Sequence, residues 1–411
     1  AALPPRYVST VDSGNLAGCL VALSQACLGT PDVRVFRWER WQGLLETLAL
    51  LGEGVQAADD KQKPSPLQAA LAEIRRQVLA VKHEPQRWLQ VLESLPLHAL
   101  PEIDRLLMEG IEVRPPTLSP EALDGLRLCS ERLRHHVMSM RREVELLVPW
   151  AALVDRPPTL LTELEEEARL LQAWRQLINA LPVTPRLGEI PEVGRAAEAR
   201  LEALRSLLVE ADRSAQPDPE ANRHHQEALA WCAQLAEALQ SARLAAGSLL
   251  IGYRRISERC EALVQAMDFS FLFDRRRQVF RIGFNLDAGK LDDNHYDLLA
   301  SEARLASLVA IAKRDVPLSH WLHLARPLTR VDGSLALLSW SGTMFEYLMP
   351  LLLTRSYPGT LIDQSCRTAV RRQMEYAGSR DAPWGISESG FYAYAAGLNY
   401  QYRAYVVPGL G

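Results

Sequence analysis

The chain has 411 residues, and 48% of them are hydrophobic, which is enough for a substantial core in two or three domains or in one large helical toroid. Its formal net charge of -4, from 46 basic and 50 acidic residues, gives no electrostatic case for nucleic acid as a partner beyond local basic patches. The sequence has no stretch of about 18 apolar residues and no signal peptide, so it predicts a soluble chain.

The cysteines carry no metal-ligand or redox pattern, because they are scattered without a CxxC pair or a Cys/His ligand spacing. We therefore predict reduced, mostly buried thiols in a cytoplasmic protein, with neither a metal site nor a cofactor. The six are Cys19, Cys27, Cys129, Cys232, Cys260 and Cys366. The chain begins without methionine and stops abruptly, which is typical of a fragment of a longer polypeptide.

Residues 1–30 are predicted to form a turn and then an amphipathic helix, since Leu16, Leu20 and Leu23 follow helical spacing. Asp12 precedes this run and suits the N-terminal cap of the helix.

From about residue 38 to 265 the chain is predicted to be nearly all helix, with apolar residues at intervals of three and four and proline-rich breaks between segments. The last segment is long enough for the arm of a helical hairpin. The region has no repeat of fixed length and no catalytic pattern, so we expect an insertion, a spacer between domains or a docking surface. The predicted helices lie near 38–52, 66–82, 86–95, 99–110, 119–149, 160–180, 195–213 and 218–265.

Two pairs of adjacent histidines, His135-His136 and His224-His225, interrupt this helical region. Neighbouring positions on a helix point about 100° apart, and no cysteine or carboxylate cluster accompanies either pair. They are predicted to be surface or packing histidines.

The sequence changes character at about residue 266. Residues 269–284 alternate as β-strands do around the polar turn 274–277, which predicts a small hairpin. Residues 285–297 follow as a loop dense in carboxylates and amides. Their spacing does not fit an EF-hand, and such a loop also suits a ligand rich in hydroxyl groups.

Glu302 is the first candidate for chemistry. A helix is predicted over about 295–313, and on it Glu302 shares an apolar stripe with Leu298 and Leu305, so its carboxylate faces inward. A buried carboxylate must be paired, protonated or functional. A structural salt bridge to another element is the alternative.

Two aromatic-rich segments follow. Residues 339–343 are predicted to start a helix that carries Trp340, with Glu346 on its first turns as a cap or a ligand-binding residue. After a helix near 362–377, the segment 384–390 sets Glu388 between serines and glycines. Its neighbours Trp384 and Tyr392 offer flat faces that stack on sugar rings or bases. A capped loop, in which Glu388 only accepts backbone hydrogen bonds, is the alternative.

Six of these segments closely resemble the glycoamylase-like region of cyclic β-1,2-glucan synthases. They are RYVSTVDSGNLA at 6–17, IGFN at 282–285, YDLLASEARLA at 296–306, LSWSGTMFEYLMP at 338–350, SYPG at 356–359 and WGISES at 384–389. The resemblance covers about 1–30 and 266–411. It implies an all-α fold, a partial (α/α)6 toroid built from 1–30 and 266–411, with 31–265 as a long helical insertion and a small β-hairpin near 269–284.

The resemblance also implies a setting. Members of this family are very large enzymes at the cytoplasmic side of the bacterial inner membrane, with neighbouring glycosyltransferase and phosphorylase-like domains. The middle domain closes a linear β-1,2-glucan chain into a ring by transglycosylation. The chain is therefore expected to be a soluble part of that domain, with β-1,2-glucan as its ligand.

Ring closure turns one β-1,2 bond into another, and such net retention generally uses two carboxyls about 5–5.5 Å apart. Glu302, on an apolar stripe, suits the general acid/base, and Glu388, in a polar loop, suits the nucleophile. The predicted glucan contacts are Asp12, Asp297, Glu346, Trp340, Trp384 and Tyr392. The alternatives are a β-1,2-glucan hydrolase of the same fold and a non-catalytic helical docking module within a larger synthase.

Overall fold

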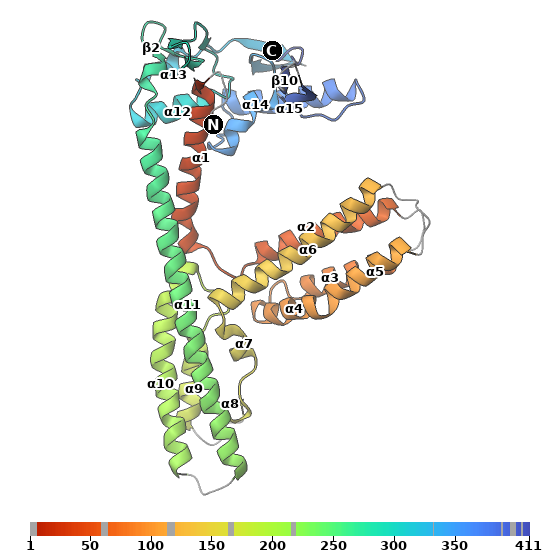
Figure 1. Cartoon of the computed structure of the whole chain (residues 1–411), viewed down its shortest axis with the longest axis vertical. Helices are drawn as coiled ribbons and strands as arrows, with labels where there is room; N and C mark the ends of the chain where they lie inside the picture. The colour runs from red at the N-terminus through yellow and green to blue at the C-terminus, as the bar shows by residue number, and fades with distance from the viewer. Residues whose placement is uncertain are drawn as a thin grey trace. The chain divides into compact units, whose positions relative to one another are not determined.

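The computed structural model describes residues 6–58, 65–112, 120–162, 168–214, 219–331, 333–387, 389–394, 400–403 and 406–411. They divide into two compact units: Ala1–Leu28 together with Arg255–Gly411, here called the split unit, and Gly29–Arg254, here called the helical unit. Figure 1 shows that helices dominate, with short strands near both ends of the chain. The mostly helical character agrees with the sequence prediction, whereas the partial (α/α)6 toroid remains a prediction.

The helical unit consists of α-helices joined by short loops. They are α2 (Trp38–Ala58), α3 (Pro66–Ala80), α4 (Trp88–Ser94), α5 (Leu100–Glu112), α6 (Pro120–Leu147), α7 (Trp150–Asp155), α8 (Thr159–Thr162), α9 (Ala168–Asn179), α10 (Ile190–Ser214) and most of α11 (Pro219–Ala266). A π-helical turn at Leu95–Ala99 joins α4 to α5. It contains Pro96, which has no N–H to donate to the regular helical pattern.

One continuous hydrophobic core runs through the helical unit, from Val35 to Ala246. α2 lies beside α6, and α9 beside α10 (Figure 1). Phe36, just before α2, packs with Trp41 of α2 and Trp88 of α4 in an aromatic cluster. Their ring centroids are 5.3–6.4 Å apart. Such aromatic pairs stabilise a core beyond their buried area, so this end of α2 is firmly fixed.

The split unit joins the start of the chain to its last part. Its helices are α1 (Thr10–Gly29), the end of α11, α12 (Arg304–Lys313), α13 (Ser319–His323), α14 (Met344–Tyr347) and α15 (Leu361–Gly378). α1 approaches α12 closely, because a Cβ added at Gly14 would lie 2.4 Å from the Cβ of Ala306. Glycine therefore permits this contact, and α1 also meets α11 through a 2.8 Å hydrogen bond between Ser24 and Ser257.

Short antiparallel strands complete the split unit. β1 (Tyr7–Ser9) pairs with β4 (Gly283–Asn285), which pairs with β5 (Lys290–Leu291); β2 (Phe273–Asp274) pairs with β3 (Val279–Arg281), which pairs with β6 (His295–Tyr296); β7 (Leu328–Val331) pairs with β8 (Ser334–Leu337), and β9 (Ser389–Tyr394) with β10 (Tyr400–Arg403). The predicted hairpin is confirmed as β2 and β3. Residues 283 and 284, which the prediction placed in the second strand of this hairpin, belong to β4 instead and pair with β1 from the other end of the chain.

Two further predictions can be compared directly with the structure. All six cysteines are free thiols, and four of them, Cys27, Cys232, Cys260 and Cys366, are buried. Within the described ranges, no helix combines the length and the apolar character that crossing a bilayer would require.

Asp274 anchors the β2–β3–β6 sheet. Its Oδ1 accepts the backbone N–H groups of Arg276 at 2.9 Å and Arg277 at 3.1 Å. Its Oδ2 accepts Arg281 Nη2 and His295 Nε2, both at 3.0 Å. The backbone N–H of Arg277, followed by the His295 hydrogen bond, lowers the pKa of Asp274 to about 2. The charged carboxylate is thus the form that stabilises this sheet.

We expect Asp274→Asn to lower the free energy of unfolding of the split unit by about 2 kcal/mol at pH 7, because four donors, one of them on buried His295, lose a charged acceptor. The folded pKa lies below the unfolded value of about 3.9, so this stabilisation is complete above about pH 5 and is lost as pH falls toward 2. Urea unfolding of the wild type and the variant at pH 7 and pH 3 should show their difference shrinking at the lower pH. Asp293→Asn, which removes an 80% exposed carboxylate, is the control and should change stability by less than about 0.5 kcal/mol.

Candidate active site

Segments that are far apart in the sequence are tied together in the split unit. Arg304, at the start of α12, donates from Nη1 to Glu346 O at 2.6 Å and from Nη2 to Tyr347 O at 2.7 Å. Met344 N donates to Ile386 O at 2.9 Å. The segments around residues 304, 346 and 386 therefore form one local arrangement, and these are three of the segments that the sequence singled out.

The last described residues of the chain join the same arrangement. Val407 N donates to Ser341 O at 2.9 Å, and Ser339 N donates to Leu410 O at 3.0 Å. Gly342 has φ +76°, and a Cβ there would lie 2.8 Å from the Cβ of Leu410. A side chain at residue 342 would be strained and would also push the 407–411 segment away.

Glu302 is buried, with 8% of its surface exposed, but not for the predicted reason. α12 begins at Arg304, so the helix predicted over 295–313 was wrong in its first half and the shared stripe does not exist. Residues 297–299 pair with Ala325 instead, through Ala325 N to Asp297 O at 2.7 Å and Leu299 N to Ala325 O at 3.0 Å. Ser301 Oγ lies 3.3 Å from Glu302 Oε2, in hydrogen-bond contact. The carboxylate is therefore held in the irregular segment just before α12.

Arg304 is a buried cation that the protein uses structurally. It is 4% exposed and donates to backbone carbonyls on both sides of the site, including Ser301 O at 3.0 Å. Burial lowers the pKa of Arg304 from its ordinary value. Tyr347 is also held by a backbone carbonyl, since its hydroxyl donates to Leu337 O at 2.6 Å. Burial raises the pKa of Tyr347 to about 12.

Glu346 caps the loop that carries Trp340. Only 1% exposed, it accepts Trp340 N on Oε1 at 2.8 Å, and Thr343 N and Oγ1 on Oε2, both at 3.0 Å. Ser341 adds its N–H and its hydroxyl, the latter at 2.7 Å. Together with Thr343 this is a capping box at the start of α14, which begins later than the predicted start at 339–343. Glu346 acts as a cap, and its predicted contact with a glucan stays a prediction.

Gln373 links the Trp340 loop to the Trp384 segment, and the sequence analysis did not identify it. It is fully buried on α15, and its Nε2 donates to Gly342 O and to Ile386 O, each at 2.9 Å. The signal that could have identified it is a polar residue on the buried stripe of α15. That stripe is made of Cys366, Ala369, Gln373 and Ala377.

The predicted aromatic contacts lie at the surface. Trp340 is 52% exposed and Trp384 is 51% exposed, so each offers a face of its ring to solvent. Asp12 is an exposed residue in the first turn of α1, and Asp297 is half-buried beside Ala325. Within the described part of the chain, no hydrogen bond joins either aspartate directly to the Glu346 loop. Glu388 lies outside the described residues, and so does the side chain of Tyr392, whose backbone is in β9.

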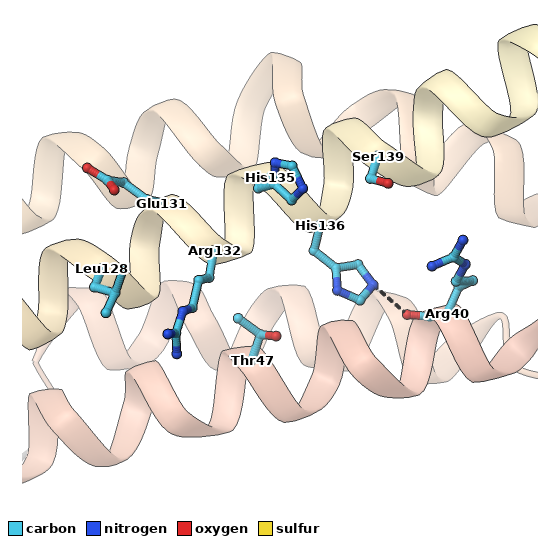
Figure 2. A pocket seen from close by; sticks show the side chains of 8 residues that line it. All are labelled: Arg40, Thr47, Leu128, Glu131, Arg132, His135, His136 and Ser139. Carbon is cyan, nitrogen blue, oxygen red and sulfur yellow. Dashed lines mark hydrogen bonds between the residues drawn. The ribbon is translucent and has the colours of Figure 1, made fainter. Parts of the chain in front are cut away.

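The helical unit has a separate cavity of about 580 Å³ between α2 and α6, which Figure 2 shows. His135 and His136 both line it, and His136 Nε2 hydrogen-bonds to Arg40 O at 2.8 Å. His136 is thus a packing histidine, as predicted, and His135 is exposed. In the described ranges, no group of three or more His, Cys, Asp or Glu side chains could hold a metal ion.

No protein-family model matches the chain. Part of the chain is similar to an enzyme that makes a cyclic β-glucan. That relative is the cyclic β-(1,2)-glucan synthase NdvB of Rhizobium meliloti (strain 1021), with 46% identity over 156 residues. The match covers 38% of this chain and 6% of the relative, so the chain spans only a small part of that protein. The identity supports the interpretation that the chain is a fragment of such a synthase.

Proposed function

We propose that the split unit is part of the region of a cyclic β-1,2-glucan synthase that closes linear β-1,2-glucan into rings. The observation that carries this proposal is the 46% identity over 156 residues to the synthase of Rhizobium meliloti. The hydrogen bonds of Arg304 to Glu346 O and of Met344 N to Ile386 O support it, because they tie the segment that carries Glu302 to the Trp340 and Trp384 segments. Sugars are held by carboxylates and by aromatic faces. The toroid and its interruption by the helical unit belong to the same proposal.

The proposed reaction is a retaining transglycosylation in two steps. Glu302 first protonates the departing glycosidic oxygen while Glu388 attacks the anomeric carbon and forms a covalent glycosyl-enzyme. Glu302 then takes the proton of the 2-hydroxyl at the other end of the chain, and that oxygen displaces Glu388.

The other predicted residues fit this proposal as contacts to the sugar. Trp340 and Trp384 have exposed ring faces on which glucose units stack. Asp12, Asp297 and Tyr392 are proposed hydrogen-bond partners of glucan hydroxyls. Glu346 acts through Trp340, whose N–H it accepts.

The same proposal sets the surroundings of the chain. A synthase of this kind would place it beside glycosyltransferase and phosphorylase-like domains, at the cytoplasmic side of the bacterial inner membrane. The proposed steps need only an acid/base and a nucleophile. Both are side-chain carboxyls of the protein, so no cofactor takes part.

The test is the product made from linear β-1,2-glucan by the complete domain. Mass spectrometry and a reducing-end assay separate a ring from a chain, because a ring is lighter by one water and has no reducing end. Rings are the expected product. Each ring closure also releases the shorter chain that carries the original reducing end, so the number of reducing ends stays constant. An increase in the number of reducing ends without rings would identify a hydrolase instead, and a domain that neither binds nor changes the glucan would favour a docking module.

A further inference from the structure

A second cavity in the helical unit is lined by an unusual concentration of arginine. It has a volume of about 420 Å³, which is within the usual range of small-molecule sites. The loop before α2 supplies Arg34 and Arg37, the first turn of α2 supplies Arg40, and α6 supplies Arg142. Among the described residues that line the cavity, Glu143 is the one carboxylate.

The charges of this cavity do not cancel. Glu143 pairs with Arg40, with 2.7 Å between Oε2 and Nη2. Arg34 donates from Nη1 to Thr184 O at 2.7 Å and to Thr184 Oγ1 at 3.0 Å, and both acceptors are neutral. Arg34 is therefore held in place, while no described carboxylate forms an ion pair with it.

Like Arg34, the side chains of Arg37 and Arg142 form no ion pair with any of the described residues. The Nε atom of Arg37 is shielded from solvent and has no hydrogen-bond partner. Such a buried, unpaired donor destabilises the empty cavity. Arg142 is exposed and forms no ion pair with any described residue. A guanidinium presents its N–H groups as a planar fork that matches the oxygens of a phosphate group.

The N-terminus of α2 adds to the positive potential of the cavity. This helix of 21 residues begins at Trp38, and the N-terminus of a helix carries a partial positive charge. Arg37 and Arg40 lie at that end, where their positive charges repel the partial positive charge of the helix. A bound anion would be attracted by all three. Glu39 shares the first turn, but it is exposed and does not line the cavity.

The scaffold that holds these arginines is fixed before any ligand arrives. Val35 N donates to Pro185 O, and Leu187 N donates to Val33 O, each at 3.0 Å. On the other side, the hydrogen bond of His136 to Arg40 O pins the start of α2 to α6 (Figure 2). A preorganised site loses less entropy when it binds a ligand than a flexible one does.

The rest of the wall indicates what else the ligand carries. Leu146, Leu147 and Leu249 contribute apolar surface, and Tyr253 contributes an aromatic ring with a hydroxyl. The cavity shares Arg40 and Ser139 with the cavity of Figure 2, where Arg132 lies a short way along α6. We propose that this arginine-lined cavity binds a ligand with phosphate groups attached to a less polar body.

The first test is isothermal titration of the full chain with pyrophosphate at low salt. We expect Arg37→Gln combined with Arg142→Gln to weaken binding about tenfold or more, because two charge-assisted forks are lost. Arg175→Gln removes the same charge from an exposed position on α9 and is the matched control, with an expected change of less than about twofold. Circular dichroism checks that each variant is folded.

The single variant Arg142→Gln keeps the test decisive if the double variant does not fold, since Arg142 is exposed. It should weaken pyrophosphate binding about threefold or more while the melting temperature stays the same. Sedimentation with phosphatidylcholine vesicles, with and without phosphatidic acid, distinguishes the source of the phosphate. If the protein binds pyrophosphate but sediments with neither kind of vesicle, the ligand is soluble. If it also sediments with the vesicles that contain phosphatidic acid, and not with phosphatidylcholine alone, the ligand is a lipid headgroup. No binding to either probe, or binding that the Arg142→Gln change leaves intact, would overturn the proposal.

Discussion

Replacing Glu302 by glutamine in the complete synthase is expected to lower the rate of ring closure by about 10³-fold. Glutamine keeps the shape of the side chain but cannot deliver a proton to the departing oxygen or take one from the incoming hydroxyl. The site itself should survive, because Arg304 holds the neighbouring backbone segments through bonds that do not involve the Glu302 carboxylate. The measurement is the initial rate of formation of cyclic product from linear β-1,2-glucan.

A second substrate separates this role from a structural one. A β-glucoside with a nitrophenol leaving group needs little protonation in the first step. Glu302→Gln should therefore slow the first-turnover burst of nitrophenol far less than it slows ring closure. Glu258→Gln removes an exposed carboxylate from α11 in the same unit, and it should leave both rates unchanged. Near-normal ring closure by Glu302→Gln would remove this residue from the proposed mechanism.

The second large effect concerns stability. Glu346→Ala is expected to lower the free energy of unfolding of the split unit by about 3–5 kcal/mol, because a buried charged acceptor disappears. The N–H groups of Trp340, Ser341 and Thr343 and the Ser341 hydroxyl would lose their common acceptor together. Urea unfolding followed by tryptophan fluorescence measures the change, since Trp340 is in the affected loop.

The matched control for this change is Glu258→Ala on α11, an exposed glutamate whose removal should cost less than about 0.5 kcal/mol. Glu346→Gln is expected to fall between the two, because an amide keeps one acceptor oxygen but brings two donors into a shell made of donors. A loss below about 1 kcal/mol for Glu346→Ala would mean that the loop finds other partners for its N–H groups.

The long helices could be predicted from the sequence because their periodic pattern extends over many turns. α6, α10 and α11 were all expected close to their observed bounds. The helix expected from residue 295 was predicted by the same reasoning and begins only at Arg304. Its first half pairs with Ala325, and such a tertiary contact outweighs local helical preference without leaving a mark on the local pattern.

The candidate site was predictable residue by residue but not as an arrangement. Burial of Glu302 was expected from an apolar stripe, and it arises instead from the segment that precedes α12. Arg304 and Gln373 escaped notice because their partners are backbone carbonyls at residues 346, 347 and 386. A side chain that binds carbonyls of distant segments has no complementary residue type that the sequence could reveal.

The arginine-lined cavity was missed for a related reason. Arg37 and Arg142 are about one hundred positions apart, and each is unremarkable on its own helix or loop. Their proximity is a property of how α2 rests on α6, which periodicity does not report.

The pairing of β1 with β4 has a consequence for the order in which the protein folds. The split unit cannot close until residues 7–9 meet residues 283–285, and an unstructured spacer would oppose that meeting with an entropy that grows with its length. The helical unit is contiguous in sequence and has its own core, so it can become structured while the ribosome still holds the later residues. We therefore expect the helical unit to fold before the split unit, with the catalytic candidates among the last of these residues to reach their native environment.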